Sequence, residues 1–132
     1  MRLLLDTHIW LDFASSPGKL GRRLRRELIS ANSELWLSPI SVWEALRLAE
    51  KGKLKSRRDD PATSIGRILE ACPMREAAIT FQIARETSMF ALPHRDPADA
   101  WLVATARVMG LVLATRDEKI TMSGLVETLG DD

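Results

Sequence analysis

The sequence predicts a three-layer α/β/α fold, in which helices cover both faces of a parallel sheet of four to five strands. Short apolar runs that suit buried strands alternate along the chain with segments whose apolar residues recur at helical spacing. Two of the helical segments open on a capping residue followed by proline, which is a common helix start. Strands that alternate with helices in this way run parallel and are joined by right-handed crossovers.

The first half of the chain contains two of the predicted strands. In order, its elements are a strand over Arg2 to Leu5, a helix over Thr7 to Ala14, a helix over Gly18 to Ala31, a strand over Glu34 to Leu37, and a helix that begins at Pro39 and stops at Gly52. Leu20, Leu24 and Leu28 recur at helical spacing with arginines between them, so the second helix is amphipathic and its arginines face water. Ser38 is the predicted cap before Pro39.

The second half follows a polar loop that reaches Pro61. Its predicted elements are a helix over Pro61 to Ala71, a strand over Arg75 to Ile79, a helix over Phe81 to Phe90, a helix over Pro97 to Met109, a strand over Leu111 to Thr115, and a short last strand over Leu125 to Leu129. Asp96 before Pro97 repeats the cap-then-proline order, and Gly110 suits the end of that helix.

Length and composition predict one domain over residues 1–132. The 132 residues are 45% hydrophobic and 28% charged, the balance of an ordinary globular protein. The one cysteine, Cys72, has no internal disulfide partner, which favours a reduced, cytoplasmic setting. Asp6 and Asp12 interrupt the apolar N-terminus, so we interpret it as a core strand and not as an export signal. No apolar run reaches the roughly 20 residues that span a bilayer, and we expect no membrane partner.

Net charge is only +1, so the overall field does not by itself indicate a polyanionic partner. The basic residues are clustered, however. One cluster consists of Arg22, Arg23, Arg25 and Arg26, and the other of Lys51, Lys53, Lys55, Arg57 and Arg58. Alone, each cluster is most simply solvated surface.

Four acidic residues fall where the carboxyl ends of the predicted strands gather, which is where open parallel sheets bind ligands. They are Asp6 after the first strand, Glu44 in the helix after the second, Asp99 in the first turn of the helix before the fourth, and Asp117 just past the fourth. Structural roles are also open to them: Asp6 and Asp117 suit helix N-caps, and Asp99 suits the helix dipole. Glu44 lies beyond a capping box if Ser38 is the cap.

Four carboxylates at one point would repel one another unless a cation lay between them. Oxygen ligands suit a hard ion, so the sequence predicts Mg²⁺, with Mn²⁺ as a substitute. Two histidines in different loops, His8 and His94, and one cysteine do not suit structural zinc. A cation held by carboxylates supports phosphodiester hydrolysis without a protein nucleophile.

Four motifs along the chain resemble a known family. They are Leu-Leu-Leu-Asp-Thr-His at 3 to 8, Ile-Ser-Val-Trp-Glu at 40 to 44, His-Arg-Asp-Pro-Ala-Asp-Ala-Trp-Leu-Val-Ala-Thr-Ala at 94 to 106, and Leu-Ala-Thr-Arg-Asp at 113 to 117. In this order they are similar to the PIN-domain ribonucleases, and among these to the VapC-type toxins of bacterial toxin–antitoxin pairs.

The resemblance implies a PIN-like fold, Mg²⁺-dependent endonucleolytic cleavage of RNA, a homodimer, and inhibition by a cognate antitoxin protein. It implies that Asp6 and Asp99 are the principal metal ligands and that Glu44 and Asp117 complete a catalytic acidic quartet. Three further residues are candidates for supporting roles: Thr7 and Thr115 orient the acids through hydroxyl hydrogen bonds, and Asp96 either serves only as the cap before Pro97 or also touches the metal or its water. The two basic clusters become candidate phosphate contacts, because an acidic centre does not attract RNA unaided.

Two other functions remain open on the sequence. A catalytically silent RNA- or protein-binding module of the same fold would keep the acids without turnover. A phosphoryl-receiver domain also places acids at the carboxyl end of a parallel sheet, but it needs paired acids after the first strand and leaves Glu44 without a role. The metal chemistry alone also does not separate RNA from DNA as the substrate.

Overall fold

A computed structural model describes residues 1–52, 60–93 and 96–131. Its sheet has five strands in the order β3-β2-β1-β4-β5, and every neighbouring pair is parallel. The strands are β1 (Arg2–Leu5), β2 (Glu34–Leu37), β3 (Arg75–Glu76), β4 (Val112–Ala114) and β5 (Thr128–Leu129). The parallel sheet predicted from the alternating pattern is therefore confirmed, with five strands.

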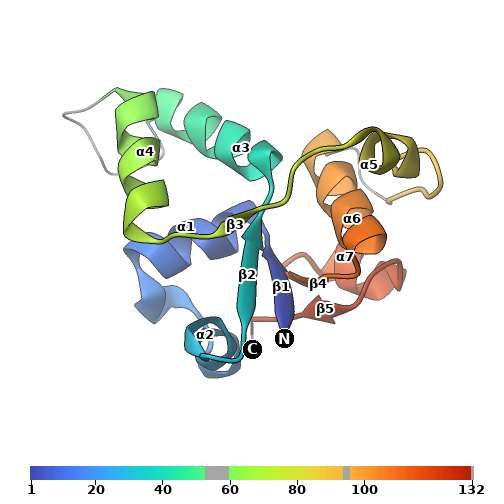
Figure 1. The fold of residues 1–132 in the computed structure, drawn as a ribbon, viewed down its shortest axis with the longest axis horizontal. Coiled ribbons are helices and arrows are strands. Elements are labelled where there is room, and N and C mark those ends of the chain that lie inside the picture. The colour runs from blue at the N-terminus through green and yellow to red at the C-terminus, as the bar shows by residue number, and fades with distance from the viewer. Residues whose placement is uncertain (53–59, 94–95, 132) are drawn as a thin grey trace.

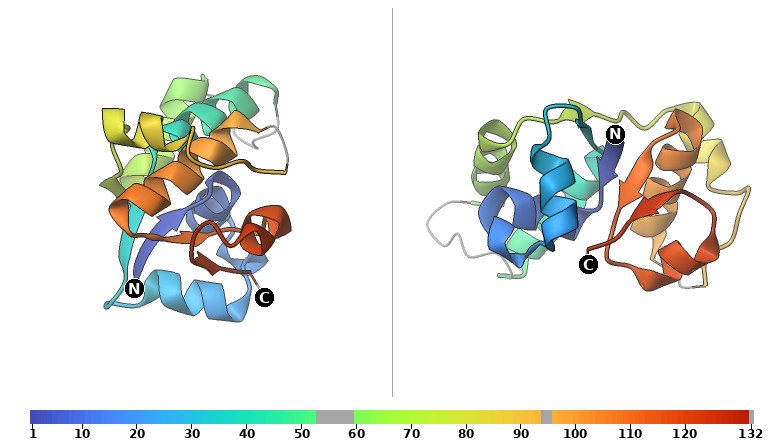
Figure 2. Two further views of the ribbon diagram at one scale, coloured as in Figure 1. Left: turned by 90° about the vertical axis from the view of Figure 1, so that its right-hand side faces the viewer. Right: turned by 90° about the horizontal axis from the view of Figure 1, so that it is seen from below.

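Helices cover both faces of this sheet. They are α1 (Thr7–Ser15), the 3₁₀ turn η1 (Pro17–Lys19), α2 (Arg22–Ile29), α3 (Pro39–Glu50), α4 (Pro61–Ala71), α5 (Phe81–Glu86), α6 (Pro97–Met109) and α7 (Glu118–Ser123). Figure 1 shows α1 to α4 on one side of the strands and α5 to α7 on the other. The two further views in Figure 2 show α5 beside α6, against which it packs.

The alternating direction of the side chains along a strand explains why helices pack on both faces of the sheet. Leu3 and Leu5 point to one face of β1 and pack with buried residues of α1 to α4. Leu4 points to the opposite face and packs with α6 and α7, in a cluster that includes Leu102 and Ile120. Successive side chains of a strand point to opposite faces, so a wholly apolar strand is the kind that needs helices on both sides. Within the described residues, no helix is both long and apolar enough to cross a bilayer.

Several predicted boundaries were wrong. The helix predicted from Gly18 to Ala31 is split, because Gly21 is extended (φ −62°, ψ 156°) and caps α2, which begins at Arg22. The strand predicted from Arg75 to Ile79 ends at Glu76, since Thr80 already caps the next helix. That helix ends at Glu86 instead of Phe90.

One helix was not predicted at all. The segment Glu118–Ser123 forms α7 directly after Asp117, which is its N-cap. It buries only Ile120 and is too short to show helical periodicity in the sequence. The N-cap of this unpredicted helix is therefore one of the four acids that are candidate metal ligands, Asp117.

The strand order places the candidate site. After β1 the chain adds β2 and β3 on one side, and it later returns to add β4 and β5 on the other. The order therefore reverses between β1 and β4, where Leu5 pairs with Ala114 and the backbone N–H of Asp6 donates to the carbonyl of Ala114 (2.9 Å). Open parallel sheets bind ligands beyond the strand ends at such a reversal.

Candidate active site

A hollow of about 310 Å³ lies beyond the carboxyl ends of β1 and β4. All four acids of the predicted quartet line it. Among the described residues, the lining consists of Asp6, His8, Ile9, Glu44, Asp96, Asp99, Arg116 and Asp117. The acids come from four different elements, so it is the fold and not sequence proximity that brings them together.

Asp6 is held in two directions at the end of β1. Its Oδ1 accepts the backbone N–H of Thr7 (2.7 Å), which makes it the N-cap of α1. Its Oδ2 accepts the hydroxyl of Thr115 (2.7 Å), which lies just past β4. The same hydroxyl oxygen accepts the backbone N–H of Asp117 (3.0 Å), so Thr115 links the two acids across the sheet reversal.

Glu44 reaches the hollow from α3. Ser38 caps that helix by accepting the N–H of Ile40 (3.1 Å), so Glu44 is not part of a capping box. Its carboxylate instead accepts the hydroxyl of Thr7 (2.5 Å), from the first turn of α1. Thr7 and Thr115 thus each donate a hydroxyl to a different acid of the hollow.

Asp99 and Asp96 both belong to the start of α6. Asp96 is the N-cap and accepts the N–H of Ala98 (3.0 Å). Asp99 lies in the first turn, where a carboxylate interacts favourably with the helix dipole, and it is only 8% exposed. Gly110 ends the same helix with φ +65°, a left-handed conformation that glycine adopts without strain.

Burial and mutual repulsion disfavour the charged forms of two of these acids. Desolvation raises the pKa of Asp6 above its ordinary value of 3.8, and Asp117 adds to the rise, although the hydroxyl of Thr115 and the N–H of Thr7 oppose it. Desolvation likewise raises the pKa of Glu44, with Asp96 and Asp6 contributing. Two raised carboxyl pKa values in one hollow are typical of a functional site.

The donor set of the hollow suits a hard divalent cation. Its acids offer only oxygen atoms, which Mg²⁺ and Mn²⁺ prefer. Within the described ranges, no group of three or more His, Cys, Asp or Glu side chains is already arranged around a single point to hold a metal ion. Mg²⁺ commonly takes one or two carboxylates and keeps several waters, so an open hollow of separate acids fits it better than it fits zinc.

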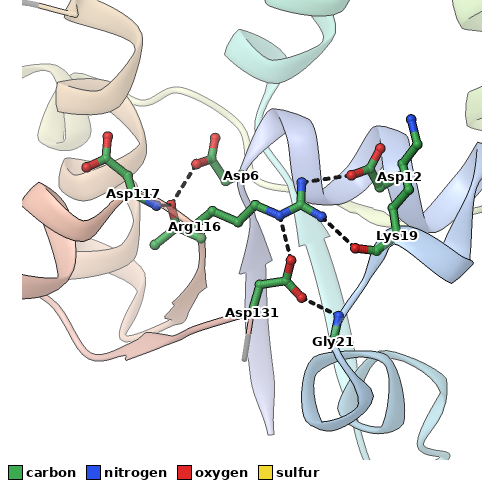
Figure 3. A network of polar contacts seen from close by, with 8 residues as sticks. Asp6, Asp12, Lys19, Gly21, Arg116, Asp117 and Asp131 are labelled. Carbon is green, nitrogen blue, oxygen red and sulfur yellow. Dashed lines mark hydrogen bonds and ion pairs between the residues drawn. The ribbon is translucent and has the colours of Figure 1, made fainter.

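Arg116 is a residue of the hollow that the sequence analysis did not single out. Its guanidinium donates to Asp12 (2.7 Å) and Asp131 (2.5 Å) and to the carbonyl of Lys19 (3.2 Å). Figure 3 shows it between those two carboxylates, on the side away from Asp117. The only signal in the sequence was its place between Thr115 and Asp117.

The described members of the predicted basic clusters are not among the residues that line the hollow. Arg22, Arg23 and Arg26 of α2 are exposed, and Arg25 is half-buried. Lys51 is exposed at the end of α3. The other members of the second cluster, Lys53, Lys55, Arg57 and Arg58, fall outside the described residues, as does His94.

The family model of the PIN domain matches residues 3–122. The fold is similar to that of solved structures over nearly the whole chain. These include VapBC2 from Rickettsia felis bound to a promoter DNA fragment (TM-score 0.71, 15% identity, 100% of each chain covered) and VapBC-1 from nontypeable Haemophilus influenzae (TM-score 0.71, 18% identity, 98% of each chain). A toxin–antitoxin complex from Klebsiella pneumoniae is similar as well (TM-score 0.66, 23% identity, 98% of each chain).

No functionally curated protein matches the sequence. The structural relatives are too distant in sequence to show more than the fold. The family model, in contrast, covers nearly the whole chain, including the segments that contain all four acids. The chain belongs to the PIN domain family.

Proposed function

We propose that this chain is a Mg²⁺-dependent endoribonuclease, with Mn²⁺ as a substitute, and that it acts as the toxin of a toxin–antitoxin pair. The main support is the convergence of four carboxylates from four elements on one hollow at the sheet reversal. Membership of the PIN family supports the same proposal, because nuclease activity is typical of that family.

We assign the cation to the four acids of the hollow. Asp6 and Asp99 are the proposed principal ligands, Glu44 and Asp117 complete the set, and Asp96 contacts the ion or its water from the cap of α6. When bound, such a cation lowers the pKa of a water molecule and neutralises charge that develops on the phosphodiester. It would also offset the desolvation, and the smaller repulsion between acids, that raise the pKa of Asp6 and Glu44.

The residues of the chain prepare the site for this chemistry by orientation. The hydroxyls of Thr7 and Thr115 donate to Glu44 and Asp6, so a threonine hydroxyl helps to orient each of these two acids. Fixed acceptors need little rearrangement when the ion and the substrate arrive, which is how preorganised sites accelerate reactions. Hydrolysis here uses water and needs no nucleophile from the protein.

The RNA backbone needs positive charge outside the acidic hollow. We assign this role to the arginines of α2 and to Lys51, with Lys53 and Lys55 beyond it in the sequence. Trp43 is 52% exposed next to Glu44, and the guanidinium of Arg47 lies 5.4 Å from its ring centroid. An exposed aromatic ring beside a catalytic acid suits stacking on a base.

We propose two protein partners, a cognate antitoxin and a second copy of this chain. One similar structure is a toxin–antitoxin complex, and another belongs to the VapBC family of toxin–antitoxin systems. For this chain, size measurements on the protein alone and with its antitoxin test both assignments.

The deciding experiment is cleavage of a mixed cellular RNA pool by purified, antitoxin-free protein. We expect cleavage with Mg²⁺ or Mn²⁺, no cleavage with EDTA, and a loss of at least about 100-fold in the Asp99→Asn variant. Asp60→Asn is the matched control. It makes the same change from carboxylate to amide, but at the N-cap of α4, away from the hollow. Its cleavage rate should stay within about twofold of the wild type.

Folded wild-type protein that binds RNA in Mg²⁺ but leaves it intact would favour the silent binding module. Equal losses in Asp99→Asn and Asp60→Asn would show that the amide substitution damages folding and not the site. A DNA substrate cut faster than RNA would change the assigned substrate and leave the assigned metal site intact.

A further inference from the structure

One arginine joins three parts of the chain beside the candidate active site. Arg116 donates to Asp12 of α1, to the carbonyl of Lys19 in η1, and to Asp131 after β5. Asp131 also accepts the backbone N–H of Gly21, which caps α2. We call Arg116, Asp12 and Asp131, with these backbone groups, the arginine clasp; Figure 3 shows it beside Asp6 and Asp117.

The clasp is attached to two of the segments that hold site residues. Arg116 lies in the loop between β4 and α7, with Thr115 before it and Asp117 after it. Asp12 belongs to α1, whose N-cap is Asp6. The loop is therefore tied to α1 at two points, by Thr115 to Asp6 (2.7 Å) and by Arg116 to Asp12 (2.7 Å).

The backbone of this loop is held by two hydrogen bonds, from the N–H of Thr115 to the carbonyl of Leu129 (3.1 Å) and from the N–H of Asp117 to the hydroxyl of Thr115 (3.0 Å). The contacts of Arg116 add a side-chain tie to α1, which further restricts the position of Asp117 relative to Asp6. The second tie is at Arg116, which lies between Thr115 and Asp117 in the sequence, and its guanidinium lies on the side away from Asp117 (Figure 3). Side chains that hold ligand-bearing segments in this way affect metal affinity without touching the ion.

We propose that Arg116 is a positioning residue that sets the separation of Asp6 and Asp117, and that Asp131 near the C-terminal end of the chain is part of the same device. This inference rests on the proposed metal site. It assigns a role in metal binding to Arg116, which lines the hollow, and to two acids, Asp12 and Asp131, which are not among the lining residues.

The alternative role for Arg116 is direct contact with an RNA phosphate, and its bonding argues against that. Its guanidinium already faces two carboxylates, so its positive charge is compensated within the protein. Although burial opposes the charged form, Asp131 and Asp12 hold the pKa of Arg116 above its ordinary value. The Asp131 side chain is only 9% exposed, so the pair is not an ordinary surface contact.

The test compares two arginines of matched surroundings. Arg107 also donates to a carboxylate, Glu86 (2.8 Å), and to a backbone carbonyl, that of Leu125 (2.9 Å), but it is not among the residues that line the hollow. For Arg116→Gln, Arg107→Gln and the wild type, Mn²⁺ affinity is measured from the free-ion electron paramagnetic resonance signal without RNA. The Mg²⁺ dependence of RNA cleavage and the thermal midpoint are measured in parallel.

We expect Arg116→Gln to bind Mn²⁺ about tenfold more weakly and to need correspondingly more Mg²⁺ for half-maximal cleavage. Arg107→Gln should lower the thermal midpoint comparably and leave Mn²⁺ affinity within about twofold of the wild type. Asp131→Asn keeps Arg116 bonded to Asp12, so a smaller loss of Mn²⁺ affinity is expected. It serves as the readout if Arg116→Gln does not fold.

Unchanged Mn²⁺ affinity in folded Arg116→Gln and Asp131→Asn would overturn the proposal. So would a raised KM for RNA with metal affinity intact, since that result identifies Arg116 as a substrate contact. Failure of the proposed function has a separate signature, because wild-type protein would then neither cleave RNA nor take up Mn²⁺ in the hollow.

Discussion

At the residue scale, Asp6 has a structural and a proposed chemical role at once. It caps α1 through the N–H of Thr7 and faces the hollow with the other acids. Burial raises the pKa of Asp6, which means that burial disfavours the ionised form of this carboxyl in the folded protein. The cap explains why an acid is tolerated there, and the raised pKa is the cost in stability of keeping it ionised.

The pKa direction leads to a prediction for Asp6→Asn in metal-free buffer. Because the folded pKa lies above 3.8, the folded protein binds this proton more tightly than the unfolded chain does. Wild-type stability is therefore lost as pH rises through the interval from 3.8 to the raised pKa. Asparagine does not titrate and still caps the helix, so Asp6→Asn should raise the thermal midpoint at neutral pH by a few degrees, an advantage that disappears in acid.

Asp60→Asn is the control with the opposite sign. The backbone N–H and hydroxyl of Thr63 hold the pKa of Asp60 below 3.8. The ionised carboxylate therefore stabilises the folded protein above pH 3.8, and this stabilisation is lost as pH falls through the lowered pKa. Asp60→Asn should thus lower the midpoint slightly at neutral pH. Thermal melts between pH 3 and 8 measure both variants, and a destabilised Asp6→Asn at neutral pH would contradict the burial argument.

That the four acids gather at one edge of the sheet could be predicted from the sequence, because each one follows a strand or lies near a helix start. The partners of Arg116 could not. Asp12 is 104 residues from it along the chain and Asp131 is 15 residues away, so no local spacing connects them. Contacts between segments that only the folded sheet brings together carry no signature in a single sequence.

At the scale of an element, α6 places Asp99 through its two ends. Asp96 and Pro97 fix where the helix begins, and Gly110 fixes where it stops. Both signals are local, so this helix was predicted with its observed bounds. Asp96 is the N-cap of this helix, and the proposal gives it a second role at the cation.

Two substitutions separate the roles of Asp96. Asp96→Asn keeps a capping oxygen, whereas Asp96→Ala loses it and should cost about 1 kcal/mol of stability. If Asp96 contacts the cation or its water, cleavage should fall about tenfold or more in both variants. Cleavage assays and thermal melts on the two proteins provide the comparison.

The matched control is Asp60→Ala, which removes the N-cap of α4 and should lower stability by a similar amount without slowing cleavage. Full cleavage by Asp96→Asn would restrict Asp96 to the cap role. The interpretation of Asp96 as a site residue would then be withdrawn.

The elements that were missed or misplaced share a physical reason. α7 buries a single residue, and β3 is two exposed residues at the sheet edge, Arg75 and Glu76. Neither is defined by its own periodicity. Each forms because neighbouring strands supply backbone partners or because a cap such as Asp117 starts it, and these causes lie outside the segment.

At the scale of the whole molecule, the order of the strands in the sheet determines which acids lie together in the hollow. The sequence predicted parallel strands but not the order 3-2-1-4-5, because order depends on which edges later strands join. That order sets β1 beside β4 and therefore Asp6 beside Asp117. Charge is therefore separated: acids line the hollow, and three exposed arginines of α2, Arg22, Arg23 and Arg26, are not among its lining residues.

This separation of charge predicts how salt affects RNA binding. Each phosphate contact that is lost should reduce the slope of log affinity against log salt by roughly 0.7 to 1. Arg22→Gln and Arg23→Gln should therefore weaken RNA binding and flatten its salt dependence while kcat stays unchanged. Arg85→Gln, an exposed arginine of α5, should change neither quantity, and an equal effect of all three would contradict a specific role for α2.

The most direct test of the central claim is a crystal structure of the protein grown with Mn²⁺ and measured at the manganese absorption edge. We predict an anomalous difference peak inside the hollow, between Asp6 and Asp99 and within reach of Glu44 and Asp117. The Asp99→Asn variant should lose or weaken that peak. An ordered hollow without manganese, or a peak held by other residues, would contradict the assignment of these four acids to a metal site.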